Sequence, residues 1–165
     1  NKFIDTKEGW IEDIKGAYLK TIRALNLIND KDKIVDVAFE SLKTDTPTAE
    51  IACSLGEYYF EKENYNQAAF WYRVALDSRP SSLNMSLTNS DYYTWIPSLQ
   101  LTVCYYNLGN LKCSYFFNEL AASFDGDKEK IEYNREIFKR DFKNLKMELP
   151  KLSYPLKLSD YINYL

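Results

Sequence analysis

The feature of this sequence that most constrains its fold is an alternation of small and large residues along two consecutive helical segments. With Ala49 as the first position, small residues occupy the eighth, twentieth and twenty-seventh positions, and bulky residues occupy the seventh, eleventh and twenty-fourth. Such an alternation lets two antiparallel helices interlock, with Gly56 at their close crossing. Only Ala52, at the fourth position, is small where a bulky residue is expected. The matching residues are Leu55, Gly56, Tyr59, Ala68, Tyr72, Ala75 and, at the thirty-second position, Pro80.

A second, weaker copy of the pattern starts at Trp95. The two starts, at positions 49 and 95, lie 46 residues apart, whereas hairpins of the tetratricopeptide type repeat about every 34 residues. The difference of about twelve residues matches a polar insertion, rich in Ser and Asn, at 81–92. Leu101, Tyr105, Gly109 and Ala121 keep the pattern, whereas Ser98, Thr102, Ser114 and Asn118 depart from it.

The pattern predicts an all-α, right-handed solenoid of the tetratricopeptide type. The chain has only five Gly and five Pro, so long helices with short connections are favoured over a many-stranded sheet. Apolar residues recur at three- and four-residue steps within each predicted helix. We expect three hairpins at about 9–43, 48–78 and 93–124, a capping helix at 128–147 to complete a repeat domain at 1–147, and an extended C-terminal tail at 148–165 with a short helix at 159–165.

Composition argues against a catalytic or metal site in this chain. It contains no histidine, which removes the commonest general base and the commonest metal ligand. Its three cysteines, Cys53, Cys104 and Cys113, form no C-x-x-C pair, and we expect reduced, buried thiols in a cytoplasmic protein. We therefore expect neither catalytic residues nor a cofactor here.

Charge and hydropathy limit the kinds of partner that we expect for this chain. The net charge is −3, so nucleic acid is not the expected partner. No apolar run reaches the length of about 18 residues that a membrane span needs. The first residue is Asn1 rather than Met, and we expect the chain to be a segment of a longer protein.

Two acidic motifs resemble metal-binding sequences. Asp30-Lys31-Asp32 has the form of the D-x-D motif that binds metal in GT-A enzymes, and 125–127 is an Asp-Gly-Asp loop. Both lie between predicted helices, where Asp commonly caps the next helix. The second motif lacks the downstream ligands of an EF-hand. We interpret both motifs as turns with helix caps.

Beyond the general repeat, several segments form an ordered series that is similar to one protein family. The insertion is followed by a Trp95-Ile96-Pro97 motif, which the general repeat lacks. In this order the segments resemble the C-terminal tetratricopeptide region of bacterial family 2 glycosyltransferases, over about residues 1–145. The resemblance implies a separate catalytic GT-A domain, absent from this chain, that binds a nucleotide-sugar and a divalent metal. The matching segments are 9–13, 47–50, 69–76, 94–101, 103–110, 115–119 and 133–135.

Candidate interaction residues come from the first helix of each hairpin, because these helices line the concave face of such solenoids. The helix at 48–62 offers Glu50, Cys53, Glu57 and Glu61, whose charge would repel a peptide carboxylate. A basic or aromatic segment, or the catalytic domain, would suit this face. The helix at 93–108 offers Ile96, Leu99, Gln100, Val103 and Asn107.

Aromatic residues near the insertion allow a second interpretation. Trp71, Tyr92, Tyr93 and Trp95 could stack on sugar rings or could pack in the core. Three functions therefore stay open. The first is an assembly module that docks on a catalytic domain, on an acceptor protein or on a second copy as a homodimer. The others are a free-standing peptide-binding adaptor and a carbohydrate-binding surface.

Overall fold

The computed structural model describes residues 2–80 and 89–165, with the side chains of 2–9 and of residue 12 excepted. Within these residues every regular element is a helix and there is no strand, which confirms the predicted all-α class. Its helices are α1 (Lys2–Leu27), α2 (Lys31–Ser41), α3 (Ala49–Glu61), α4 (Tyr65–Asp77), α5 (Trp95–Asn107), α6 (Leu111–Ser123) and α7 (Lys128–Asn144), with two 3-10 helices, η1 (Ser90–Tyr93) and η2 (Leu158–Tyr164).

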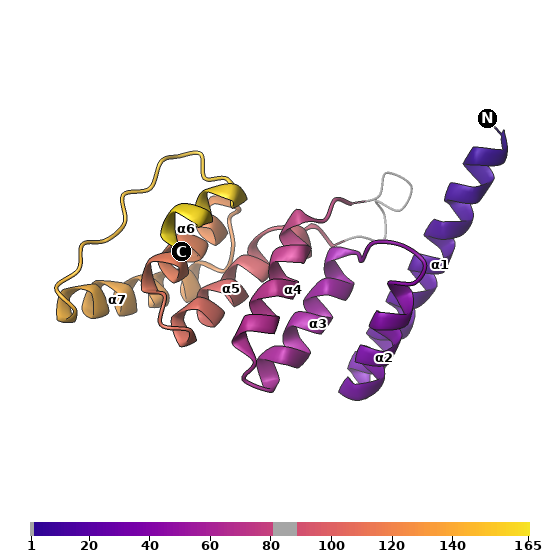
Figure 1. Ribbon diagram of the computed structural model, residues 1–165, viewed down its shortest axis with the longest axis horizontal. Helices are drawn as coiled ribbons and strands as arrows, with labels where there is room; N and C mark the ends of the chain where they lie inside the picture. The colour runs from indigo at the N-terminus through magenta and orange to yellow at the C-terminus, as the bar shows by residue number, and fades with distance from the viewer. Residues whose placement is uncertain (1, 81–88) are drawn as a thin grey trace.

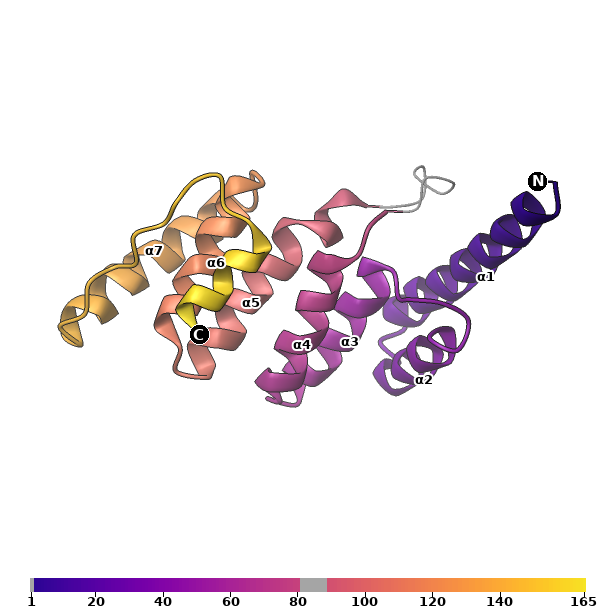
Figure 2. The same ribbon diagram turned by 45° about the horizontal axis from the view of Figure 1, so that its top comes forward.

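The helices stack in chain order. Each α-helix packs against the one before it and the one after it. The result is an elongated, layered molecule with α1 at one end and α7 at the other (Figures 1 and 2). Successive hairpins that pack mainly on their neighbours are the arrangement of an α-solenoid.

The three hairpins share one turn geometry. In each turn, a residue with positive φ (between 55° and 77°) precedes an Asp or Asn. That Asp or Asn donates its backbone N–H to a carbonyl five residues earlier, at 2.9–3.1 Å. Its side chain also accepts a hydrogen bond from the backbone three residues later and so caps the next helix. The three pairs are Asn29-Asp30, Glu63-Asn64 and Gly109-Asn110.

The core of the stack is built from the residues of the repeat signature. Tyr72 on α4 exposes only 2% of its surface, and its ring covers Gly56 on α3. A Cβ placed at Gly56 would lie 2.8 Å from Tyr72 Cε1, so the predicted close crossing at this glycine is confirmed. Tyr59 is half-buried, whereas Pro80 is exposed and follows the end of α4. Leu55, Ala68, Ala75, Leu101, Tyr105 and Ala121 are all buried.

Polar residues of the second copy are buried with hydrogen-bond partners. Ser114 Oγ donates to the Thr102 carbonyl at 2.6 Å, and Thr102 Oγ1 donates to the Ser98 carbonyl at 3.0 Å. Asn118, where an aromatic residue is expected, receives a hydrogen bond from Asn134 Nδ2 of α7 at 2.9 Å. These partners account for the departures from the pattern, because a buried polar group is tolerated when its hydrogen bonds are made.

Several boundaries differ from the predicted ones. Helix α1 begins at Lys2 rather than at 9, and the sequence before Gly9 has no Gly or Pro to interrupt it. Helix α5 begins at Trp95 rather than at 93, because the residues before it form η1. Helix α7 ends at Asn144 rather than at 147, because Lys146 adopts a φ of 54°.

The C-terminal tail packs on the helical stack. After α7 the chain runs back along the molecule, and η2 lies on α6 (Figure 1). Tyr164 stacks on Phe116 with ring centroids 5.4 Å apart, and Tyr161 packs on Phe117 at 5.6 Å. Arg73 on α4 also donates a hydrogen bond to the Tyr161 hydroxyl at 3.2 Å. The sequence pattern predicts that the tail is separate from the repeat domain. In the structure, the tail is instead part of the same hydrophobic core.

Candidate functional site

A groove crosses the first helices of the three hairpins. Residues of α1, α3 and α5 line it, together with Tyr72 of α4 and Tyr92 of η1, and its volume is about 830 Å³. We call it the α1–α3–α5 groove. It brings together four of the predicted interaction residues, which are Glu57, Glu61, Tyr92 and Gln100.

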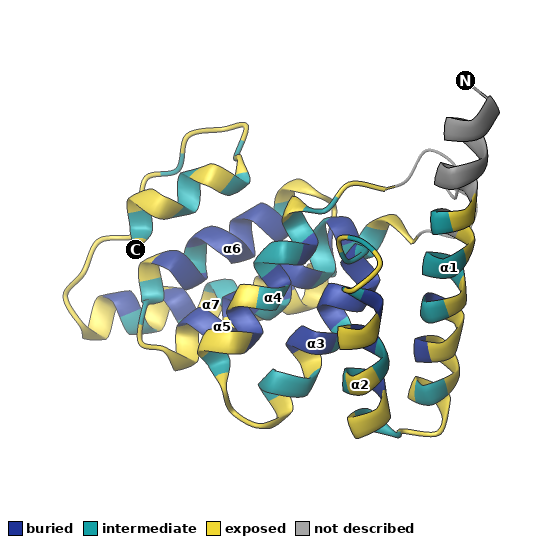
Figure 3. Cartoon of the chain, turned by 45° about the vertical axis from the view of Figure 1, so that its right-hand side comes forward, coloured by how far each residue is buried: buried dark blue, intermediate teal, exposed yellow. Residues whose placement is uncertain are grey.

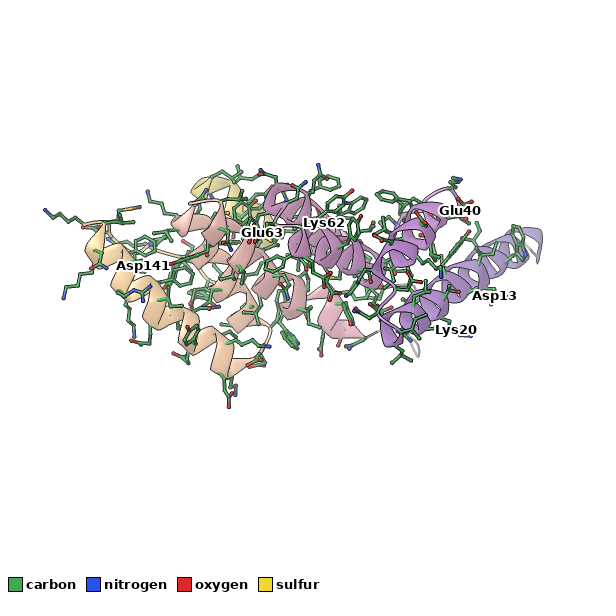
Figure 4. All side chains as sticks on the ribbon, turned by 90° about the horizontal axis from the view of Figure 1, so that it is seen from below. Asp13, Lys20, Glu40, Lys62, Glu63 and Asp141 are labelled. Atoms are coloured by element: carbon green, nitrogen blue, oxygen red, sulfur yellow. The ribbon has the colours of Figure 1, made fainter. Side chains whose placement is uncertain are left out.

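The groove face of α3 follows from helical spacing. Cys53, Glu57 and Phe60 recur at steps of three or four residues, which places them on one stripe of the helix. Outside the groove most charged residues are exposed, among them Lys20, Glu40 and Lys62 (Figure 4), whereas Glu119 is buried. Burial follows the same division: buried residues concentrate on the inner faces of α3 to α6, while α1 is largely exposed (Figure 3).

Two glutamates of the groove share one lysine. Lys31 Nζ of α2 lies 2.9 Å from Glu57 Oε1 and 3.4 Å from Glu61 Oε1. Partial burial works to lower the pKa of Lys31, but its hydrogen bonds and attraction to the two glutamates outweigh that effect and raise the pKa. Because two carboxylates face one ammonium, this cluster keeps a negative charge. Lys31 comes from another hairpin, and helix periodicity alone does not reveal it.

A buried carboxylate lies about two turns before Glu57 on α3. Glu50 exposes only 5% of its surface. Its Oε1 accepts hydrogen bonds from Arg23 NH2 of α1 at 2.7 Å and from the backbone N–H of Asn89 at 3.3 Å. Its Oε2 has no hydrogen-bond partner in the described part of the chain. Unpaired buried acceptors are costly and rare in folded proteins.

The cysteines are unsuited to nucleophilic chemistry. All three are free and buried. Burial raises the pKa of Cys104 and of Cys113 to about 12, and burial together with Glu50 and Glu57 raises the pKa of Cys53 further. The three thiols are therefore protonated at neutral pH, whereas a reactive cysteine needs its thiolate.

The aromatic residues near the insertion lie in different parts of the fold. Tyr93 is only 8% exposed and belongs to the core, so the interpretation of Tyr93 as a surface interaction residue is wrong. Trp95 packs against the buried cluster of Leu99, Ala121 and Ile131, and Tyr92 is half-buried at the groove. These rings do not form one exposed platform. Residues 81–88 of the predicted insertion lie outside the described residues.

The remaining candidate, Asn107, lies outside the groove. It is exposed near the end of α5, where its side-chain amide donates to the Val103 carbonyl at 2.9 Å. A smaller apolar pocket of about 230 Å³ lies on the other flank of α5, towards α7. Val103, Tyr106 and Tyr133 line this pocket, which separates Val103 from the groove that Ile96 and Gln100 face.

The two acidic motifs act as helix caps. Asp30 accepts from the Lys33 N–H at 3.3 Å, and Asp127 accepts from the Lys130 N–H at 3.2 Å. Among the described residues, no group of three His, Cys, Asp or Glu side chains could hold a metal ion. No helix in residues 2–80 and 89–165 is long and apolar enough to cross a membrane.

Comparison with known proteins identifies no relative of this chain. No family model, curated protein or solved structure matches the chain.

Proposed function

We propose that this chain is a non-catalytic protein-interaction module, a right-handed α-solenoid of the tetratricopeptide type that binds a polypeptide segment in its α1–α3–α5 groove. The observation that carries the proposal is the groove itself. It crosses three successive hairpins, is lined by the first helix of each, and mixes charged, aromatic and aliphatic side chains. Surfaces of this kind suit extended peptides better than small molecules.

The spacing of the turns supports the tetratricopeptide type. The capping residues Asp30 and Asn64 are 34 residues apart and occupy equivalent places in identical turns. That interval is the period of about 34 residues expected of such repeats. The next capping residue, Asn110, follows after 46 residues, and the additional residues fall in the segment that contains 81–92.

The resemblance to family 2 glycosyltransferases suggests the biological setting. In that setting the chain docks on the catalytic domain of its own parent protein, on an acceptor protein or on a second copy of itself, in the cytoplasm. The nucleotide-sugar and the divalent metal belong to the catalytic domain. The buried, free thiols are compatible with a reducing compartment.

Light scattering during size-exclusion chromatography tests the proposal. The chain is measured alone and mixed with the upstream segment of its parent protein. We expect a dimer or a stable complex, and the complex should be lost in Gln100→Trp, which fills the groove. Gln67→Trp on the exposed start of α4 is the matched control and should leave it intact.

Three outcomes separate the alternatives. Loss of the complex in Gln100→Trp alone supports docking through the groove. A complex that withstands both substitutions rules out the groove as its site. A monomer that ignores the upstream segment rules out docking on the catalytic domain and on a second copy, and favours an acceptor-binding or free-standing peptide-binding module.

A further inference from the structure

We infer that the α1–α3–α5 groove selects an extended segment that carries a basic side chain flanked by aromatic or aliphatic ones. This inference rests on the proposed function and specifies the chemistry of the partner. It depends on two properties of the groove: its negative charge and its apolar walls.

The first property is the excess negative charge on α3. Glu57 and Glu61 are half exposed, with side-chain exposures of 50% and 48%, so both can be reached by a ligand. They share Lys31, which neutralises only one of the two carboxylates. A lysine or arginine of the partner would supply the missing positive charge. An acidic segment would meet repulsion at the same place.

The second property is the apolar surface beside these charges. Leu27 on the α1 wall is 90% exposed, an unusual position for a leucine next to a groove. Phe60 and Tyr92 contribute half-buried rings, and Ile96 faces them from α5. Apolar or aromatic residues on either side of the basic one would bury this surface.

Titration with defined peptides tests the inference. The probes are three acetylated, amidated peptide pools of about ten residues, which span about 33 Å when extended. All pools carry Phe, Tyr and Leu at the same positions, and they differ only in Lys and Arg, Gln, or Glu between them. We expect the basic pool to shift the backbone amide resonances of Ser54, Glu57, Glu61 and Gln100 in the isotope-labelled chain.

Salt and substitution should both weaken this binding. Between about 50 mM and about 500 mM NaCl the affinity should fall severalfold, since half-exposed charges are screened. Glu57→Gln with Glu61→Gln should weaken binding about tenfold, which corresponds to about 1.4 kcal/mol. The matched control is Glu40→Gln with Glu136→Gln, because these exposed glutamates also pair with lysines and the net charge changes equally.

The outcomes distinguish the inference from the proposed function. If the Gln or Glu pool binds the groove as tightly as the basic pool, or if the α3 double variant binds normally, the charge selection is wrong but groove binding stands. If no pool shifts the groove resonances at about 1 mM peptide, both fail. Weakening in the control variant as well would show a nonspecific charge effect and overturn the inference.

Discussion

At the scale of single residues, the contact between Gly56 and Tyr72 controls how closely α3 and α4 approach. The Tyr72 ring lies where any larger residue at position 56 would place its Cβ, at 2.8–2.9 Å from three ring carbons. Since Tyr72 is itself buried, the ring has little room to move away. The hairpin therefore requires the absence of a side chain at this position.

Gly56→Ala should destabilise the chain by roughly 1–3 kcal/mol through this overlap. Alanine by itself favours a helix by about 1 kcal/mol over glycine, so the sign of the measured change shows which effect dominates. Urea unfolding followed by circular dichroism measures it. In a Tyr72→Leu background the same substitution should cost less, and an equal cost in both backgrounds would exclude the ring as the cause.

At the scale of the helices, the shared turns decide where each hairpin reverses. Gly109 has a φ of 77°, and the equivalent Asn29 and Glu63 adopt the same left-handed conformation with side chains. The following Asp or Asn then starts the next helix. The three turns therefore reverse the chain with the same backbone conformation and the same type of cap.

Two glycines with open surroundings provide a test of this geometry. A Cβ at Gly109 or at Gly16 would have no neighbour within 4 Å, but only Gly109 has positive φ. Gly109→Ala should therefore destabilise by about 1–2 kcal/mol, whereas Gly16→Ala, in α1, should stabilise by up to about 1 kcal/mol. Thermal unfolding compares them, and changes of the same sign would contradict the expectation.

The two capping aspartates should make the free energy of unfolding depend on pH in the acidic range. Hydrogen bonds with Lys33 and Lys130 lower the pKa of Asp30 and Asp127, respectively, below the ordinary value of 3.8. Because the folded-state pKa is the lower one, each carboxylate contributes stability that is complete above that ordinary value and is lost as pH falls through the lowered pKa.

Asp30→Asn with Asp127→Asn keeps the caps but removes this titration. The wild-type chain should exceed the double variant in stability at about pH 7, and the gap should close at about pH 2. Melting temperatures across this range measure the gap. A difference in melting temperature that stays constant with pH would show that the two carboxylate charges do not cause it.

At the scale of the whole molecule, the apolar core is divided along the stack. One buried cluster joins α1, α2 and α3, and a larger one runs from α3 to α6 and includes rings of the tail. Adjacent layers of helices therefore stabilise each other through these shared clusters. The tail is the exception, because it connects α4 with residues 88 positions later.

Tyr161→Ala tests the role of the tail in this larger cluster. The substitution removes a ring from Phe117 and a hydrogen-bond acceptor from Arg73, so we expect a loss of roughly 1–3 kcal/mol, less than for a fully buried ring. Tyr154→Ala, at a residue that is 65% exposed, should change stability by no more than about 0.5 kcal/mol. Equal losses in urea unfolding would contradict a specific role for Tyr161.

Much of the helical stack could be predicted, because the repeat signature is local and periodic. The spacing of Leu55, Tyr72 and Ala75 identifies one hairpin from its own sequence. Helical spacing likewise predicts that Glu57 and Glu61 lie on one face of α3. The docking of the tail could not be predicted in this way. Its contacts join Tyr161 and Tyr164 to distant rings, and no period in the sequence relates them.

The features of the groove also divide into those that local periodicity reveals and those that depend on contacts between distant residues. Helical periodicity identified only some of the α3 and α5 residues that face it. It missed Ser54 and Phe60, and it also offered residues outside the lining: Glu50, Leu99, Val103 and Asn107. It did not identify the pairing of Lys31 with the glutamates, since these residues belong to different hairpins. Nor did it distinguish Tyr93, which is buried, from the adjacent Tyr92, which borders the groove, because η1 turns the two side chains into different surroundings.

The docked tail also has a mechanical consequence. If the molecule is pulled by its two ends, α1 and α2 are held mainly through their contacts with each other and with α3, and by the Phe39 ring of α2 on Trp71 of α4, so they should detach first under low force. The region from α4 to α7 is different, because the tail runs back to Arg73 and fastens these layers together. Tension applied at the C-terminus must first peel η2 from α6 before it can extend the layers beneath.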